Sequence, residues 1–202
     1  MNANIPVLFR TYQSIKPHSN CKIWEAARAT SAAPTFFKRI EIGWNKQPYI
    51  DGGLGCNNPS QLVLNEAKAQ FGDARHIGCL VSIGTGQAKV TDIKKPGFFQ
   101  QIIPTDVIDA LKKISTDCDT THQEMLRRFA RLQDTYFRLN VDQGMQGIGL
   151  SKWEKLSTVE AHTVQYMARE EVDEKFTSLV NVIRVPRSQL TLNQLSMEES
   201  LL

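Results

Sequence analysis

Residues 29–59 read ATSAAPTFFKRIEIGWNKQPYIDGGLGCNNP, and this stretch carries the signals that decide the fold. FKRIEIG, at residues 37–43, alternates apolar and polar side chains and predicts a strand, and YID, before the glycines, predicts a second extended piece. Asn58 and Pro59 then offer a cap and a first-turn proline for a helix through QLVLNEAKAQF, which Gly72 would end. Two strands and a helix are therefore expected in close succession.

The flanking residues predict more elements of the same two kinds. PVLFRTYQ, at residues 6–13, is short and rich in apolar side chains, which predicts a strand. KIWEAARATSAA, at residues 22–33, predicts a helix closed by Pro34. HIGCLVSIG, at residues 76–84, is nearly continuous in apolar side chains and is typical of a strand buried on both faces. Because strands and helices alternate, the fold class expected is α/β.

The later part of the chain is mostly helical in pattern. Periodic apolar residues predict helices in DVIDALKKI, EMLRRFARL and VEAHTVQYMAREEVDEKFTSLVNVI, and YFRLNV predicts a strand. After Pro186 the sequence is polar and weakly periodic. We therefore expect an α/β portion at residues 1–95, a mostly helical completion of the domain at 96–185, and a polar tail or linker at 186–202.

Composition and charge narrow the class of protein. The 202 residues are 41% hydrophobic and 22% charged, which is enough for one domain with its own core. The 24 basic and 21 acidic residues are spread along the chain without a polycationic arm, so we expect no nucleic-acid partner. No apolar run approaches the roughly 18 residues that span a bilayer, and the start of the chain lacks a signal pattern. We expect a cytoplasmic location, with peripheral membrane contact left open.

The cysteines argue for free thiols. Four are present, widely separated, without a C-x-x-C pair or a histidine at ligand spacing: Cys21, Cys56, Cys79 and Cys118. This spacing favours reduced side chains over a zinc site or a disulfide framework. We expect no metal and no cofactor.

Asp51, Gly52 and Gly53 are the strongest candidate site, and two interpretations stay open for them. Asp-Gly between extended segments is a strong hairpin-turn signal. A carboxylate at the end of an apolar strand is also well placed to act as a base, and the two glycines would let the backbone turn sharply beside it. The three residues alone do not separate these interpretations.

Other candidates have simpler explanations. SIGTG at residues 82–86 is better explained as a tight strand exit than as a phosphate loop, since no Gly-Lys-Ser/Thr follows it. Four isolated histidines belong to no local Ser-His or Cys-His signature: His18, His76, His122 and His162. Three arginines could face anionic lipid from one helix, although a solvated helix face is favoured: Arg127, Arg128 and Arg131.

The longer pattern resembles a known family. ARATSAAPTFF, a strand, YIDGGLGCNNP, a helix and a strand ending in LVSIGTG occur in the order seen in the C-terminal half of a patatin-like phospholipase domain. LKKISTDCDTTHQEML, YFRLNVDQGMQGIGL and WEKLSTVEAHTVQYM look like the tail of fungal patatin-like proteins. The resemblance covers roughly residues 5–185.

This resemblance implies a fold and a chemistry. The family has a three-layer α/β/α sandwich and hydrolyses acyl esters of phospholipids or neutral lipids with a Ser-Asp dyad. Its aspartate lies in an Asp-Gly-Gly or Asp-Gly-Ala motif, which corresponds here to Asp51, Gly52 and Gly53, so Asp51 is the expected proton acceptor. A carboxylate can take a serine proton when it is within hydrogen-bond reach and partly desolvated.

The nucleophile motif of the family is not found in these residues. The family serine lies in a G-x-S-x-G elbow, and a glycine-rich loop supplies donors to the oxyanion. The nearest approach is LVSIG at residues 80–84, which lacks the first glycine and places Ser82 inside a strand. We expect the chain to begin partway through the domain, as a truncated gene model, a short isoform or a decayed copy.

Two function classes follow from the match and its departures. The chain is either the aspartate-carrying part of a lipid acyl hydrolase, or a catalytically inactive patatin-like remnant that binds lipid or protein within a larger signalling protein with further domains downstream. Because a base without a nucleophile leaves little acyl transfer, we predict that purified residues 1–202 do not hydrolyse a p-nitrophenyl ester. Serine-dependent hydrolysis by this chain would contradict the prediction.

Overall fold

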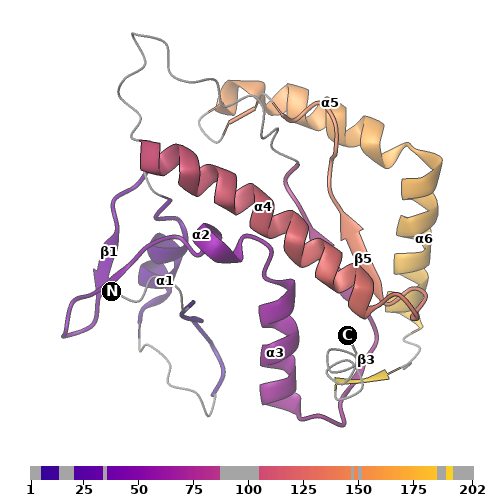
Figure 1. Cartoon of the computed structure of the whole chain (residues 1–202), viewed down its shortest axis with the longest axis horizontal. Helices are drawn as coiled ribbons and strands as arrows, with labels where there is room; N and C mark the ends of the chain where they lie inside the picture. Colours follow the sequence, from indigo (N-terminus) through magenta and orange to yellow (C-terminus); the bar gives the residue numbers. More distant parts are fainter. Residues whose placement is uncertain are drawn as a thin grey trace. The chain divides into compact units, whose positions relative to one another are not determined.

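The computed structural model contains two compact units (Figure 1). The first comprises Met1–Asn57 with Lys95–Cys118, and the second comprises Asn58–Lys94 with Asp119–Leu202. The structure describes residues 6–13, 21–33, 36–86, 105–146, 148–149, 152–185 and 190–192. Pro34, Pro186, His18 and the polar end of the chain beyond residue 192 lie outside the described residues.

The first unit contains the helix predicted at residues 22–33, slightly shortened. This helix, α1, spans Ile23–Thr30. It begins where the Lys22 backbone N–H donates to the Glu25 carboxylate at 2.7 Å, an acidic contact that suits a helix N-terminus. It ends where the Ser31 hydroxyl donates to the Ala27 carbonyl at 2.8 Å. Local hydrogen bonds therefore mark both ends of the helix, and Pro34, which was expected to close it, lies outside the described residues.

A two-stranded antiparallel hairpin follows α1. Its strands are β1 (Ile40–Ile42) and β2 (Gln47–Tyr49), with Ile40 opposite Tyr49 and Glu41 opposite Pro48. The strand expected at residues 37–43 and the extended piece before Asp51 are thus confirmed in position. Figure 1 shows α1 beside this hairpin, and the two elements are in contact.

The strand predicted at residues 6–13 is wrong in this structure. These residues have no regular secondary structure, although the Phe9 ring packs on the Tyr49 ring with 5.4 Å between centroids. A strand needs a partner for its backbone N–H and C=O groups, and no described strand pairs with this segment. Apolar composition alone was therefore an insufficient signal.

A short helical turn, α2 (Gly53–Cys56), follows the hairpin. Gly52 precedes it with φ −67° and ψ −11°, a conformation open to any residue. Gly55, inside the turn, has φ +114°, where a side chain is strained. The sharp turn expected at Gly52 and Gly53 therefore depends on a glycine outside that pair.

The second unit contains most of the predicted helices. Helix α3 (Ser60–Phe71) ends at Gly72, whose φ of +80° is the left-handed geometry that stops a helix. Helix α4 (Thr105–Arg128) starts in the first unit and ends in the second. A 3₁₀ turn, η2 (Trp153–Lys155), leads into α5 (Leu156–Met167), and α6 (Glu170–Arg184) follows.

The break between α5 and α6 occurs at Arg169. Its backbone is extended, with ψ 135°, and its guanidinium Nη1 contacts both carboxylate oxygens of Asp142 at 2.8 and 2.9 Å. These hydrogen bonds hold the pKa of Asp142 below its usual value. An ion pair with the loop after β5 therefore helps to fix the position where one helix ends and the next begins.

The segment at residues 76–84 forms two short strands rather than one. Strand β3 (His76–Ile77) pairs antiparallel with β6 (Leu190–Thr191), and β4 (Leu80–Ile83) pairs parallel with β5 (Tyr136–Leu139), the strand predicted in YFRLNV. Leu80 and Ser82 are buried, while Val81 and Ile83 are exposed. The expectation of burial on both faces is wrong, because only one face of β4 is covered within the described residues.

The core of the second unit joins segments far apart in sequence. Its buried side chains come from α3, β4, α4, the residue after α4 and the residue after β6: Leu64, Leu80, Met125, Phe129 and Leu192. A second cluster contains Val141, Tyr166 and Val172. Because helices pack with short parallel and antiparallel strands, the fold class is α/β, as predicted.

None of the helices within the described ranges is both long enough and apolar enough to cross a bilayer.

We predict that Met125→Ala lowers the free energy of unfolding by about 2–5 kcal/mol, because Met125 is fully buried and its removal leaves a cavity. Urea denaturation followed by circular dichroism measures this change. Leu126→Ala is the matched control on the same helix, where the side chain is 44% exposed, and it should change stability by less than about 0.5 kcal/mol. Equal effects of the two substitutions would contradict this core.

We further predict that Gly55→Ala costs roughly 1–3 kcal/mol, whereas Gly52→Ala changes stability by less than about 1 kcal/mol. A Cβ at either position meets no atom within 4 Å, so the pair differs in backbone angle alone. Thermal melts of the two variants measure the difference. A destabilised Gly52→Ala beside an unchanged Gly55→Ala would show that the backbone angles of this turn are assigned incorrectly.

Candidate active site

Asp51 lies two residues after β2, at the point where the hairpin leads into α2. Its backbone N–H donates to the Ala32 carbonyl at 3.2 Å, which connects it to the residues just after α1. Its side-chain Oδ1 accepts the Gly53 backbone N–H at 2.7 Å. The side chain is half-buried. Two hydrogen bonds thus fix both the backbone and the carboxylate of this residue.

The hairpin-turn interpretation of Asp51, Gly52 and Gly53 is wrong. The hairpin turn lies earlier, where the Lys46 N–H donates to the Gly43 carbonyl at 3.1 Å. After Asp51 the chain enters a helical turn in which the Cys56 N–H donates to the Gly52 carbonyl at 3.0 Å. Asp51 therefore occupies the start of a helical turn, where a carboxylate oxygen satisfies a backbone donor.

The geometry of Asp51 leaves one carboxylate oxygen for chemistry. Within the described ranges, Oδ1 receives the Gly53 N–H and no donor bonds to Oδ2. A carboxylate held by one oxygen keeps its direction while the other oxygen accepts a proton. The arrangement therefore suits a general base as well as a structural cap, and the two roles are compatible.

Ser82 is engaged in a buried polar network of the second unit. Its Oγ accepts a hydrogen bond from Arg138 Nη1 at 2.8 Å and donates to Asn58 Oδ1 at 3.3 Å. The Ser60 hydroxyl also donates to Asn58 Oδ1, at 2.7 Å. Ser82 lies within β4, as expected from the sequence, rather than on a strand-to-helix elbow. Its position is that of a packed polar residue.

His122 and Tyr136 border this network. His122 Nδ1 lies 2.9 Å from Tyr136 Oη. Burial raises the pKa of Tyr136, whereas burial followed by the charge of Arg138 lowers the pKa of His122. A neutral imidazole and a neutral phenol are therefore favoured at neutral pH. His122 therefore packs against a tyrosine, in agreement with the interpretation of the histidines as surface or packed residues.

Sequence reasoning missed Asn58, Ser60, Tyr136 and Arg138 as members of one network. Ser82 and Arg138 are directly opposite in the parallel register of β4 and β5. Each of these polar residues stands between apolar neighbours in its strand, and this pattern could have indicated that the two side chains lie on one face of the sheet. The prediction also requires knowing that β4 pairs with β5, which neither segment shows by itself.

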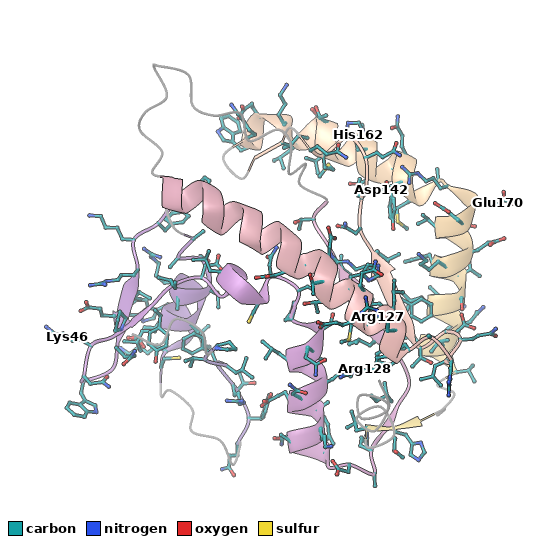
Figure 2. The ribbon with its side chains drawn as sticks, in the orientation of Figure 1. Lys46, Arg127, Arg128, Asp142, His162 and Glu170 are labelled. Atoms are coloured by element: carbon teal, nitrogen blue, oxygen red, sulfur yellow. The ribbon has the colours of Figure 1, made fainter. Side chains whose placement is uncertain are left out.

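Of the three arginines near the end of α4, Arg128 has a packing contact. Arg128 Nη1 donates to Gln61 Oε1 at 2.8 Å, and burial lowers the pKa of its guanidinium. Figure 2 shows Arg127 and Arg128 at the end of α4, and His162 on α5. The contact of Arg128 with α3 favours a packing role over a lipid-facing one.

None of the four cysteines forms a disulfide. Burial, followed by the charge of Asp117, raises the pKa of the Cys56 thiol, and burial raises that of Cys79, so neither is activated as a thiolate. Among the residues with a described placement, no group of three or more His, Cys, Asp or Glu side chains could hold a metal ion.

Comparison with known proteins points to one family. Residues 3–64 match the model of the patatin-like phospholipase family, and this range includes Asp51, Gly52 and Gly53. Calcium-independent phospholipase A2-gamma of Rattus norvegicus is 33% identical over 177 residues, which are 87% of this chain and 21% of that protein. The Homo sapiens protein of the same name is 32% identical over 152 residues, 74% of this chain and 18% of that protein.

A protein from a third organism has a similar level of identity to this chain. Patatin-like phospholipase 1 of Plasmodium falciparum is 33% identical over 136 residues, 59% of this chain and 20% of that protein. No solved structure gives a significant match. The chain spans about a fifth of the length of these curated relatives. The chain therefore carries a patatin-like phospholipase segment at residues 3–64 and is homologous to calcium-independent phospholipase A2-gamma over most of its length.

Proposed function

We propose that this chain supplies the general base of a serine acyl-ester hydrolase whose substrates are phospholipids or other acyl lipids. Asp51 is the proton acceptor. The main observation in support is the geometry of the Asp51 carboxylate. The Gly53 backbone N–H donates to Oδ1, with 2.7 Å between the nitrogen and the oxygen. Support comes from the position of Asp51 inside the segment that matches the patatin-like phospholipase model.

The proposed reaction uses Asp51 twice. Asp51 accepts the proton of a serine hydroxyl as the serine oxygen attacks the acyl carbon, and it then returns that proton to the leaving alcohol as the ester bond breaks. Water next attacks the acyl-serine and gives a proton to Asp51, and Asp51 returns that proton to the serine oxygen as the bond to the acyl group breaks and the fatty acid is released. The nucleophile would be a serine in a G-x-S-x-G elbow, a motif that the 202 residues do not contain.

A second candidate function is binding without turnover, in a patatin-like module that recognises lipid or a protein partner. It is favoured by the engagement of Ser82 with Arg138 and Asn58, which leaves the serine nearest to an elbow motif in a structural role. Under either function we propose a cytoplasmic protein with peripheral membrane contact. If the chain is a binding module, we propose that it is joined to further domains in a larger protein.

We predict that Asp51→Asn lowers ester hydrolysis by roughly 10²-fold or more in a chain joined to an upstream segment that carries the G-x-S-x-G elbow. The substitution is nearly isosteric but removes the base. Hydrolysis of a p-nitrophenyl ester and of a phospholipid, both without calcium, measures the loss. Asp73→Asn is the matched control, because Asp73 is exposed and pairs with Lys68 at 3.2 Å.

Two outcomes would decide against the proposal. Turnover equal to that of the wild type by an Asp51→Asn protein with an unchanged melting temperature would exclude Asp51 as the base. A joined wild-type chain that binds phospholipid vesicles but hydrolyses neither substrate would instead support the binding module.

A further inference from the structure

We propose that the first unit carries a membrane-docking surface for anionic bilayers. This inference rests on the proposed function, because an enzyme that hydrolyses acyl lipids must reach its substrate at a membrane. We call this surface the aromatic–basic surface and define it by four aromatic and four basic side chains on α1 and the hairpin segment: Trp24, Phe36, Phe37, Trp44, Arg28, Lys38, Arg39 and Lys46.

The turn between β1 and β2 presents a tryptophan to solvent. Trp44 is 97% exposed although an indole is among the most favourable side chains to bury. The turn itself is ordered, with Gly43 at φ +81° and the Lys46 N–H bonded to the Gly43 carbonyl at 3.1 Å. Figure 2 shows Lys46 on this turn. The turn thus presents an exposed indole two residues before a lysine.

A second group of exposed rings lies on α1 and just before β1. Trp24 is 60% exposed and Phe37 is 59% exposed. Trp24 borders an open depression of about 880 Å³, which is also lined by Arg28, Lys38, Arg39, Ile40 and Glu41. The three-residue strand β1 connects this depression to the turn at Trp44, a span of about 10 Å at the usual rise of a strand.

Internal contacts hold the cations of this surface close to its rings. The Arg28 guanidinium lies over the Phe37 ring at 5.5 Å, and its Nη2 donates to the Lys38 carbonyl at 2.6 Å. Arg39 pairs loosely with Glu41 at 3.8 Å, and both side chains remain largely exposed. Arg28, Phe37 and Lys38 are therefore neighbours rather than separate exposed residues.

The segment that carries these rings has an excess of positive charge. Residues 22–46 contain five basic and two acidic side chains, an excess of three. The whole chain has 24 basic and 21 acidic residues, so the remaining residues hold 19 of each sign and are neutral overall. The entire net charge of +3 thus lies on the segment that exposes the four rings.

This chemistry fits the surface of an anionic bilayer. Tryptophan prefers the headgroup level of a membrane, and lysine and arginine beside it are attracted to anionic lipid. Scattered exposed apolar residues are ordinary, but exposed aromatics in a segment with an excess of three positive charges indicate a specific occupant. An apolar protein partner would account for the rings and leave the charge excess unexplained.

The first test measures binding of the 202-residue chain to vesicles by co-sedimentation, using phosphatidylcholine alone and phosphatidylcholine with 30% phosphatidylserine, an amount on the order of that in anionic membranes. We expect binding to the mixed vesicles, weakened at least about tenfold by Trp44→Ala, because the indole loses its burial in the bilayer interface. Trp153→Ala is the matched control: Trp153 is 77% exposed in the second unit, and its loss should change binding less than about twofold. Both variants should keep the melting temperature of the wild type.

The second test addresses charge. Lys46→Gln and Lys38→Gln should each weaken binding to the mixed vesicles about fivefold, and high salt should reduce these effects. Lys155→Gln, an exposed control in the second unit, should have no such effect.

The proposal is wrong if the wild type binds neither kind of vesicle, or if Trp44→Ala and Trp153→Ala weaken vesicle binding equally. It is also wrong if Trp44→Ala keeps vesicle binding but loses self-association in sedimentation velocity. Asp51→Asn should bind vesicles as the wild type does. If Asp51→Asn retains turnover in the joined chain, the proposed base is wrong and the docking surface stands. If Trp44→Ala retains vesicle binding, the surface is wrong and the base stands.

Discussion

Two hydrogen bonds of Asp51 organise the described part of the first unit. The Asp51 N–H to the Ala32 carbonyl joins the hairpin to the end of α1, and the Gly53 N–H to Oδ1 starts the turn of α2. The carboxylate is therefore oriented by the same contacts that connect three consecutive elements. Under the proposed function, its orientation would be set by the backbone before any substrate binds, and the cost of positioning it would already be met in folding.

The second unit uses its polar side chains differently. Ser82, Asn58, Ser60 and Arg138 satisfy one another in a buried network, and Tyr136 and His122 close one side of it. Such networks stabilise a fold only when every member has a hydrogen-bond partner. The loss of one hydroxyl would therefore leave buried polar groups without a partner. The serine in this unit that most resembles a nucleophile by sequence is thus explained by packing between two parallel strands.

Local signals predicted the helices well, and nonlocal pairing limited the prediction of the strands. Glu25 near the start of α1 and Gly72 at the end of α3 act on their own neighbours, so their effects could be predicted from sequence. Residues 6–13 and 76–84 each looked like one strand by composition, but the first has no described strand partner and the second divides into β3 and β4, which pair with different strands. The position of Asp51 was predicted from motif and resemblance. The φ of Gly55 and the Ser82–Arg138 pairing needed the structure, because neither follows from residue type alone.

Pro48 in β2 has a consequence for how the hairpin behaves in a crowded solution. Paired with Glu41, it has no N–H to offer to a further strand, so the outer side of β2 cannot extend into a regular ladder with another chain. Exposed hairpins usually risk joining edge to edge into aggregates, and a proline on the edge interrupts that growth. The molecule can therefore display a bare indole at the tip of this hairpin while its backbone resists polymerising through the same element.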